Sequence, residues 1–167
     1  MDRERAPIFR DVREATDYAR TRGARRVVLA NGCFDPLHVG HLRYLEGAKA
    51  QGDFLLVALN DDRSTRALKG PKRPVLGETD RARLLASLRM VDAVLLFGDR
   101  DVVRILEAVR PSCHAKGTDY TAETVPERET SRRLGIETAI VGDPKTHASR
   151  EIVQVIQSRS RSGKERG

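Results

Sequence analysis

The chain has 167 residues, a length that suits one domain with a substantial core. Hydrophobic residues make up 39% of it and charged residues 33%, and no apolar run approaches the ~18 residues of a bilayer-spanning helix. The N-terminus, MDRERAPIFRDV, lacks the apolar stretch of a secretory signal, and two cysteines, Cys33 and Cys113, cannot form a disulfide framework. We therefore expect a globular cytoplasmic protein that does not contact a membrane.

The net charge of +7 lies at the two ends of the chain. Residues 1–26 and 157–167 each carry an excess of three positive charges, whereas residues 27–156 contain 19 basic and 18 acidic residues. The final segment, QSRSRSGKERG, has no aromatic residue on which a base could stack. A nucleic-acid partner is therefore disfavoured, and we predict a disordered basic tail over residues 158–167.

Apolar positions in residues 8–21 are three and four apart, which predicts a leading helix within residues 1–25 that Gly23 ends. After it, short apolar runs alternate with amphipathic segments, a pattern typical of parallel strands covered on both faces. Strands are expected at 26–30, 54–59, 93–97, 112–116 and 137–141, and helices at 39–51, 78–90, 101–109, 125–134 and 149–158. Residues 26–157 are therefore expected to form one α/β domain, a doubly wound, Rossmann-like, mostly parallel five-stranded sheet with helices on both faces.

Residues 61–77, DDRSTRALKGPKRPVLG, are polar, basic and interrupted by Gly70, Pro71 and Pro74. This composition predicts a mobile loop after the second strand. In parallel sheets, ligands bind to loops at the carboxyl ends of the strands. We therefore expect the functional site in the loops that follow the first and second strands.

Residues 31–45, NGCFDPLHVGHLRYL, follow the first expected strand. A helix that begins near His38 points its free amide groups at the carboxyl end of that strand, which is the geometry of a phosphate site. His38 and His41 are three apart and face the same side of this helix, where their imidazole N–H groups can donate to phosphate oxygens. Gly40 lets an anion approach the backbone, and Asp35 is placed to hold the loop.

Other interpretations of the two histidines remain open. They could bind a metal together with His114, His147 or the cysteines, although no CxxC or HExxH spacing is present. They could also be ordinary core or capping residues. No GxGxxG fingerprint, P-loop or nucleophile motif is present, which disfavours a dinucleotide site.

The stretch G-x-F-D-P-L-H-x-G-H after a first strand resembles the HxGH signature of the nucleotidyltransferase superfamily, which includes the cytidylyltransferases. The segments NDDRSTRALKG, RPV, ETDRARLLASL, VDAVLLF and KGTDY are most similar to the bacterial heptose 1-phosphate adenylyltransferases, and the resemblance covers nearly all of residues 26–157. It implies that a nucleoside monophosphate, AMP above CMP, passes from a nucleoside triphosphate to a sugar 1-phosphate, with release of pyrophosphate by in-line attack. It also implies Mg²⁺ as a cofactor and a homodimer.

Two alternatives accompany this reading. One is a cytidylyltransferase that uses CTP and acts on glycerol 3-phosphate or another alcohol phosphate. The other is a non-catalytic nucleotide-binding or RNA-binding protein of the same fold.

The resemblance also implies three groups of site residues. His38 and His41 contact the phosphates and stabilise the transition state, and Lys69 neutralises phosphate charge from the mobile loop. The nucleotide-binding residues are Gly32, Cys33, Phe34, Asp35, Gly40, Lys116, Gly117, Asp119, Ser149 and Arg150, and the acceptor-binding residues are Asn60, Asp61, Lys72 and Arg81. The serine and threonine motif that the family carries at its last helix is altered here to HASREIV, which bears on nucleotide preference.

Overall fold

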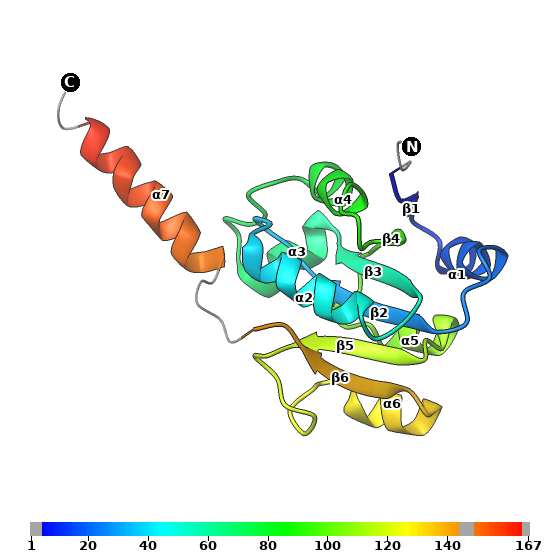
Figure 1. Cartoon of the computed structure of the whole chain (residues 1–167). Coiled ribbons are helices and arrows are strands. Elements are labelled where there is room, and N and C mark those ends of the chain that lie inside the picture. The colour runs from blue at the N-terminus through cyan, green and yellow to red at the C-terminus, as the bar shows by residue number, and fades with distance from the viewer. Residues whose placement is uncertain (1–4, 144–148, 165–167) are drawn as a thin grey trace.

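The structure, a computed structural model, describes residues 5–143 and 149–164, with the side chains of residues 5–143 and 151–158. Its centre is a parallel sheet with the strand order β1-β4-β3-β2-β5-β6 (Figure 1). The strands are β1 Ile8–Phe9, β2 Val27–Gly32, β3 Phe54–Asn60, β4 Ala93–Phe97, β5 Cys113–Gly117 and β6 Glu137–Val141. The five expected strands are all present, and β1 is an additional strand at the edge.

Helices cover both faces of this sheet (Figure 1). Apolar residues of α2 and α4, such as Leu45 and Leu85, pack on one face, and those of α1 and α5, such as Ala15 and Leu106, pack on the other. All seven residues of β3 are buried, which explains the unbroken apolar run in the sequence. The helices are α1 Val12–Thr21, α2 Val39–Lys49, α3 Asp62–Lys69, α4 Glu78–Ala86, α5 Val103–Val109, α6 Arg128–Leu134 and α7 Ser149–Lys164. The predicted doubly wound fold is confirmed.

The leading segment corrects one prediction. We expected a helix over residues 8–21, but α1 begins only at Val12, and Ile8–Phe9 form β1 alongside β4. The carboxylate of Asp11 accepts hydrogen bonds from amide groups in the first turn of α1, which fixes the start of the helix. A strand of two residues contains only one period of the alternating pattern, which is too short for the spacing of apolar residues to reveal it.

Two further segments are more regular than expected. Helix α3 occupies the first half of the segment that we predicted to be a loop, and Gly70, with φ of 102°, ends it. Helix α7 continues to Lys164, so the predicted disordered tail is helical over residues 158–164. The described side chains of both helices are largely exposed, and an exposed helix can be as polar as a loop, so composition does not separate the two.

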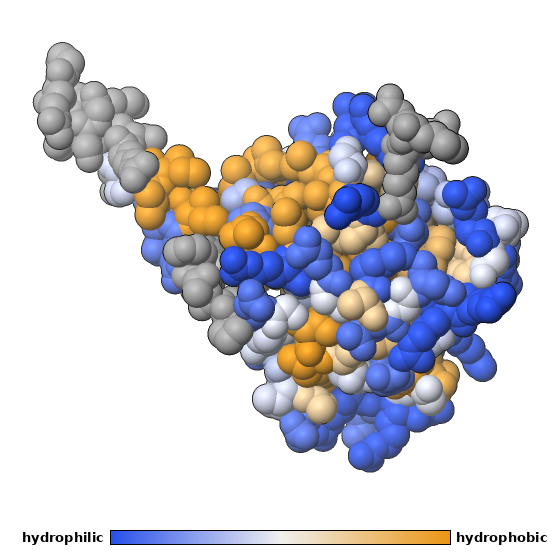
Figure 2. All heavy atoms as spheres, viewed as in Figure 1, coloured by the Kyte–Doolittle hydropathy of each residue, from blue (hydrophilic) through white to orange (hydrophobic). Residues whose placement is uncertain are grey.

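Helix α7 extends away from the sheet in Figure 1. Figure 2 shows apolar residues on α7 and on the neighbouring upper part of the body. On α7, Val155 is 48% exposed and Ile156 is 59% exposed. Even so, no helix within residues 5–143 and 149–164 combines the length and apolar character needed to cross a bilayer.

The chain reverses its direction across the sheet between β2 and β5. Strands β2, β3 and β4 follow one another toward one edge, and β5 and β6 then continue from the other side of β2. In doubly wound sheets, ligands bind at the carboxyl ends of the strands at such a switch point. Helix α2 begins at this point, directly after β2.

Candidate functional site

A pocket of about 900 Å³ opens at this switch point. We call it the nucleotide pocket, after the ligand that the sequence predicts. It is lined by the end of β2 and the start of α2, by the loop after β5, and by the end of α3. Most of the predicted site residues meet here: His38, His41, Lys69, Gly32, Cys33, Phe34, Gly40, Asn60, Lys116, Gly117 and Asp119. The structure therefore brings together side chains that lie up to 87 positions apart in the sequence, from Gly32 to Asp119.

The two histidines form a reciprocal cap at the start of α2. The amide of Gly40 donates to Nδ1 of His38 over 3.1 Å, and the amide of His38 donates to Nδ1 of His41 over 3.3 Å. Their ring centroids are 3.9 Å apart. A neutral imidazole that accepts at Nδ1 carries its proton on Nε2, so capping fixes the tautomer of each ring with an N–H donor on its other edge. The capping interpretation is thus correct, and it is compatible with phosphate binding.

The turn before α2 forms the floor beneath these rings. Phe34 has φ of 47°, a left-handed conformation that costs energy in a residue other than glycine. Phe34 is 2% exposed, and its ring packs against His41 with 5.1 Å between the ring centroids. A Cβ atom at Gly32 would lie 3.2 Å from the Phe34 ring. Gly32 therefore makes room for the ring that supports His41.

Asp35 holds the chain after α3 against this turn. Its carboxylate is fully buried, accepts a hydrogen bond from Nε of Arg73 over 2.7 Å, and also accepts from the amides of Val75 and Leu76. Burial alone would raise the pKa of Asp35, but these amide and guanidinium donors outweigh it and hold the pKa below its usual value. Asp35 lies outside the lining of the pocket, whereas Arg73 belongs to it.

Arg81, predicted to bind the acceptor, is 1% exposed and lies beneath the pocket. Its guanidinium donates to the carbonyl oxygens of Cys33, Asn60 and Leu76 and to the carboxylate of Asp62, all within 2.7–2.8 Å. These bonds join the carboxyl ends of β2 and β3 to the start of α4. The placement corrects the expectation of a direct contact, because buried acceptors already engage the guanidinium.

Two other predicted acceptor residues also lie away from the pocket. Asp61 caps α3 by accepting from the amide of Ser64 over 2.7 Å, and Lys72 is exposed in the turn that follows the helix. Asn60 is therefore the one predicted acceptor residue that lines the nucleotide pocket. The order of residues along a chain does not show which of two neighbours at the end of a strand faces the pocket.

The structure adds side chains that sequence reasoning missed: Arg43, Arg73, Arg100, Tyr120 and Glu127 line the pocket. Arg100 is exposed, and no ion-pair partner is found for it within the described residues. Arg100 follows the end of β4. Ligands bind to loops at the carboxyl ends of parallel strands, so a search that included the loop after the third expected strand would have found it.

A hydrogen-bonded chain crosses the β5 side of the pocket. Nε2 of His114 lies 2.9 Å from Oδ1 of Asn31, and Nζ of Lys116 lies 3.4 Å from the same oxygen. Burial and the charge of Lys116 lower the pKa of His114 to about 3, so its ring is neutral and donates from Nε2. The Lys116 ammonium also lies 3.2 Å from Oε2 of Glu127 and 4.8 Å from the centroid of the Tyr120 ring. Lys116 therefore lines the pocket as one member of a buried ion pair.

No cluster of three or more metal-binding side chains occurs in the described part of the chain. Mg²⁺ retains much of its water and is bound largely by substrate phosphates, so it requires few protein ligands. Asp101 and Asp119 line the pocket and fit that role through their carboxylate oxygens.

The start of α7 faces the pocket, since Glu151 is part of its lining. Ser149 and Arg150 begin this helix, but their side chains lie outside the described residues, as does all of His147. Their expected contact with the nucleotide remains a prediction.

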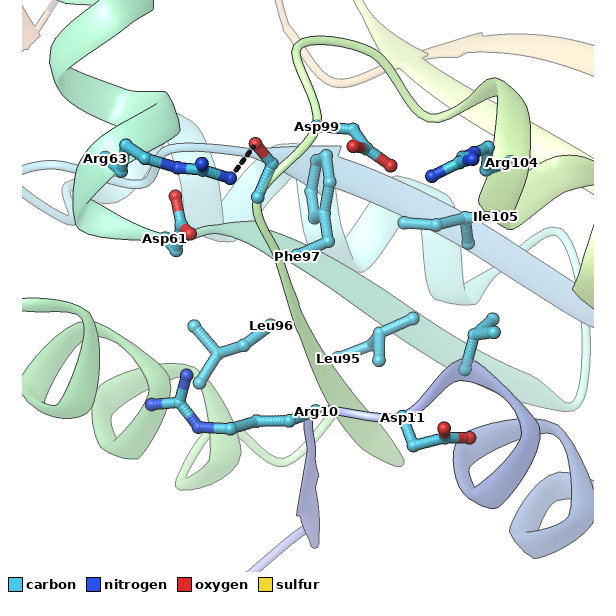
Figure 3. Close-up of a pocket in the computed structure, with 12 residues that line it drawn as sticks. Arg10, Asp11, Asp61, Arg63, Leu95, Leu96, Phe97, Asp99, Arg104 and Ile105 are labelled. Carbon is cyan, nitrogen blue, oxygen red and sulfur yellow. Dashed lines mark hydrogen bonds between the residues drawn. The ribbon is translucent and has the colours of Figure 1, made fainter.

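A second pocket, of about 470 Å³, lies at the carboxyl end of β4 (Figure 3). We call it the edge pocket, and Phe97 lines both pockets. Figure 3 shows arginine and aspartate side chains around it, with Arg63 donating to the carbonyl of Gly98 over 3.4 Å. Of the predicted site residues whose side chains the structure describes, only Asp61 lines the edge pocket.

Comparisons with known proteins extend this picture. The family model described as Cytidylyltransferase-like matches residues 29–161. Among curated proteins, the chain is 44% identical over 133 residues to the bifunctional protein HldE of Methylobacillus flagellatus, and 48% identical over 120 residues to HldE of Koribacter versatilis. These alignments cover 80% and 72% of this chain but 27% and 25% of the relatives, so the chain spans about a quarter of their length.

Solved structures agree with the fold. A lipopolysaccharide core biosynthesis protein from Thermoplasma volcanium is 27% identical, with a TM-score of 0.62 over 72% of this chain and 98% of that one. Pantothenate synthetase from Thermus thermophilus is 18% identical, with a TM-score of 0.61 over 87% of this chain and 67% of that one, and shares the fold.

Proposed function

This chain belongs to the cytidylyltransferase-like family of nucleotidyltransferases, and we propose that it transfers a nucleoside monophosphate from a nucleoside triphosphate to a sugar 1-phosphate. We propose ATP as the donor and a heptose 1-phosphate as the acceptor. The segments that resemble heptose 1-phosphate adenylyltransferases support this choice, as does the similarity to a lipopolysaccharide core biosynthesis protein.

The histidine cap at the mouth of α2 is the observation that carries the proposal. It combines the amide groups of a helix start with two imidazoles whose Nδ1 atoms are committed to the backbone. Neutral rings of this tautomer present N–H donors without the desolvation that a buried cation would require. Such donors suit the oxygens of a triphosphate at the α2 mouth.

The reaction requires no general base. An oxygen of the sugar phosphate, already anionic at pH 7, forms a bond to the α-phosphorus while the bond from that phosphorus to the departing pyrophosphate oxygen breaks in line. Catalysis then consists of holding two polyanions together and stabilising the charge that moves onto pyrophosphate. Lys69 and Arg100 line the pocket as cations, and His38 and His41 donate to the phosphates in this scheme.

Mg²⁺ bound to the triphosphate would neutralise part of this charge. Asp101 and Asp119 line the pocket, and their carboxylate oxygens would hold that ion through its water ligands.

Pyrophosphate release tests the proposal. ATP and CTP are each combined with heptose 1-phosphate, glucose 1-phosphate and glycerol 3-phosphate, and we expect the fastest release from ATP with heptose 1-phosphate. Preference for CTP with glycerol 3-phosphate would favour the cytidylyltransferase alternative. Tight ATP binding with no release from any pair would instead indicate a non-catalytic nucleotide-binding protein. The His41→Ala variant is the negative control, since it should lower turnover by about 10²- to 10³-fold, the loss expected for one transition-state donor.

A further inference from the structure

Glu127 places a carboxylate in a pocket that binds two polyanions in the proposed reaction. It precedes α6, is 5% exposed and lines the nucleotide pocket. A carboxylate repels phosphate, and burying one is costly unless a cation and hydrogen bonds compensate it. Its presence therefore points to a task other than phosphate binding.

Lys116 supplies the compensating cation. Its ammonium lies 3.2 Å from Oε2 of Glu127 and 3.4 Å from Oδ1 of Asn31, and the face of the Tyr120 ring is 4.8 Å away. Because His114 donates to the same Asn31 oxygen, that oxygen is held in place as an acceptor for the ammonium. Lys116 therefore holds Glu127 in position, and its ammonium compensates the charge of the Glu127 carboxylate before any ligand enters.

The second carboxylate oxygen of Glu127 is the one that a ligand can reach. Within the described residues, no group donates a hydrogen bond to Oε1, and Oε1 is not among the polar atoms sealed from solvent without a partner. A carboxylate is acceptor-only, so the ligand group that it recognises must carry a donor. Sugar rings carry such donors in their hydroxyl groups, and carboxylates bind ribose hydroxyls in other parallel sheets.

We propose that Glu127, positioned by Lys116, accepts a hydrogen bond from a hydroxyl group of a sugar ring and so makes the pocket selective for hydroxylated ligands. This inference rests on the proposed function, in which two such rings enter the pocket, the ribose of the nucleotide and the acceptor sugar. Both present the same chemistry to Glu127, and the experiment separates them.

The nucleotide arm of the experiment removes a ribose hydroxyl from ATP and, separately, the charge from Glu127. Binding of ATP, 2′-deoxy-ATP and 3′-deoxy-ATP is measured by calorimetry, without acceptor, for the wild type and for Glu127→Gln. A hydrogen bond to a charged group predicts that the wild type loses about 10- to 100-fold in affinity when the recognised hydroxyl is absent. The variant should show little such discrimination, because the two changes remove the same interaction.

The acceptor arm applies the same comparison to kcat/KM for heptose 1-phosphate and its single-deoxy analogues. Discrimination that depends on Glu127 in this arm alone identifies the acceptor sugar as the bound ring. Equal discrimination by the wild type and Glu127→Gln in both arms overturns the inference.

Controls keep the result interpretable. Glu123→Gln alters an exposed carboxylate in the same loop, outside the pocket lining, and should discriminate as the wild type does. If Glu127→Gln does not fold, Lys116→Met combined with Glu127→Gln removes both charges of the pair and is measured in its place. If ATP and its deoxy analogues bind equally well, the proposed transfer reaction is not contradicted. If ATP binds more tightly than its deoxy analogues but no pyrophosphate is released, the proposed function is contradicted and the role of Glu127 is not.

Discussion

The nucleotide pocket and the edge pocket are built in the same way and differ in the residues that cap their helices. Both lie at the carboxyl ends of parallel strands beside the start of a helix. In the nucleotide pocket the imidazole of His38 caps α2, whereas in the edge pocket the carboxylates of Asp11 and Asp61 cap α1 and α3. A carboxylate cap neutralises the positive end of a helix, and a neutral imidazole does not. This difference favours an anion at the start of α2 over the starts of α1 and α3.

Two of the three arginines that line the edge pocket already have partners. Arg63 donates to a backbone carbonyl and lies beside Asp61, and Arg10 pairs with Glu78 at 2.7 Å. In the nucleotide pocket, by contrast, Arg100 has no such partner within the described residues. Cations that are already paired attract a further anion weakly, so Arg10 and Arg63 add less to anion binding than Arg100 does.

Replacing His38 by Asp should produce the largest effect, because it gives α2 the kind of cap found at α1. Asp is a good N-cap, so the helix should persist. The variant loses an N–H donor and places a negative charge beside the proposed triphosphate site, which should lower kcat by about 10³-fold or more. Pyrophosphate release measures the loss, and thermal unfolding checks that the fold is retained.

His38→Asn is the matched control, because it caps the helix without a charge. Its loss should be about 10²-fold, the lower end of the range for one missing donor. If Asp and Asn lower turnover equally, cap charge does not distinguish the two pockets.

Replacing Asp35 by Asn should weaken the attachment of the segment after α3 to the turn before α2. The change leaves the Arg73 guanidinium, 13% exposed, without its buried partner. Breaking a buried ion pair from one side should lower the free energy of unfolding by about 3 kcal/mol. Urea titration measures this, with Glu107→Gln as the control. That change removes an exposed pair with Arg133 and should cost at most about 0.5 kcal/mol.

The same carboxylate should make stability depend on pH at the acid end. The folded-state pKa of Asp35 is lowered, so its stabilising contribution is complete above the pKa of the unfolded chain and is lost as pH falls through the folded-state value. The difference in unfolding free energy between the wild type and Asp35→Asn should therefore narrow below about pH 4, where free carboxylates protonate. A difference that stays constant in acid would exclude Asp35 as the titrating group.

Replacing Asp11 by Ala should have the smallest effect and sharpen the contrast between the pockets. Loss of this cap should lower the free energy of unfolding by about 1 kcal/mol, while pyrophosphate release stays unchanged. Asp11→Asn keeps the cap and should recover most of the stability. A fall in turnover with either variant would indicate that the edge pocket takes part in the reaction.

Strong local signals made much of this molecule predictable. The unbroken apolar run of β3 indicated a strand buried on both faces, and the spacing of His38 and His41 after β2 indicated the pocket. Features that depend on contacts across the sheet were missed. The resemblance implies that Arg81 contacts the acceptor, and only the positions of the β2 and β3 carbonyls show that it is buried. Lys116 reads as a phosphate ligand until Glu127, eleven residues later, is placed beside it.

The buried guanidinium of Arg81 limits how this protein can change. One side chain serves four acceptors on three separate segments, and the single ammonium of a lysine could not reproduce that planar fork. Any replacement at this position would therefore leave several carbonyl groups without a donor at once, next to the lining of the nucleotide pocket. Substitutions at Arg81 should consequently unfold the protein rather than change its substrate preference gradually.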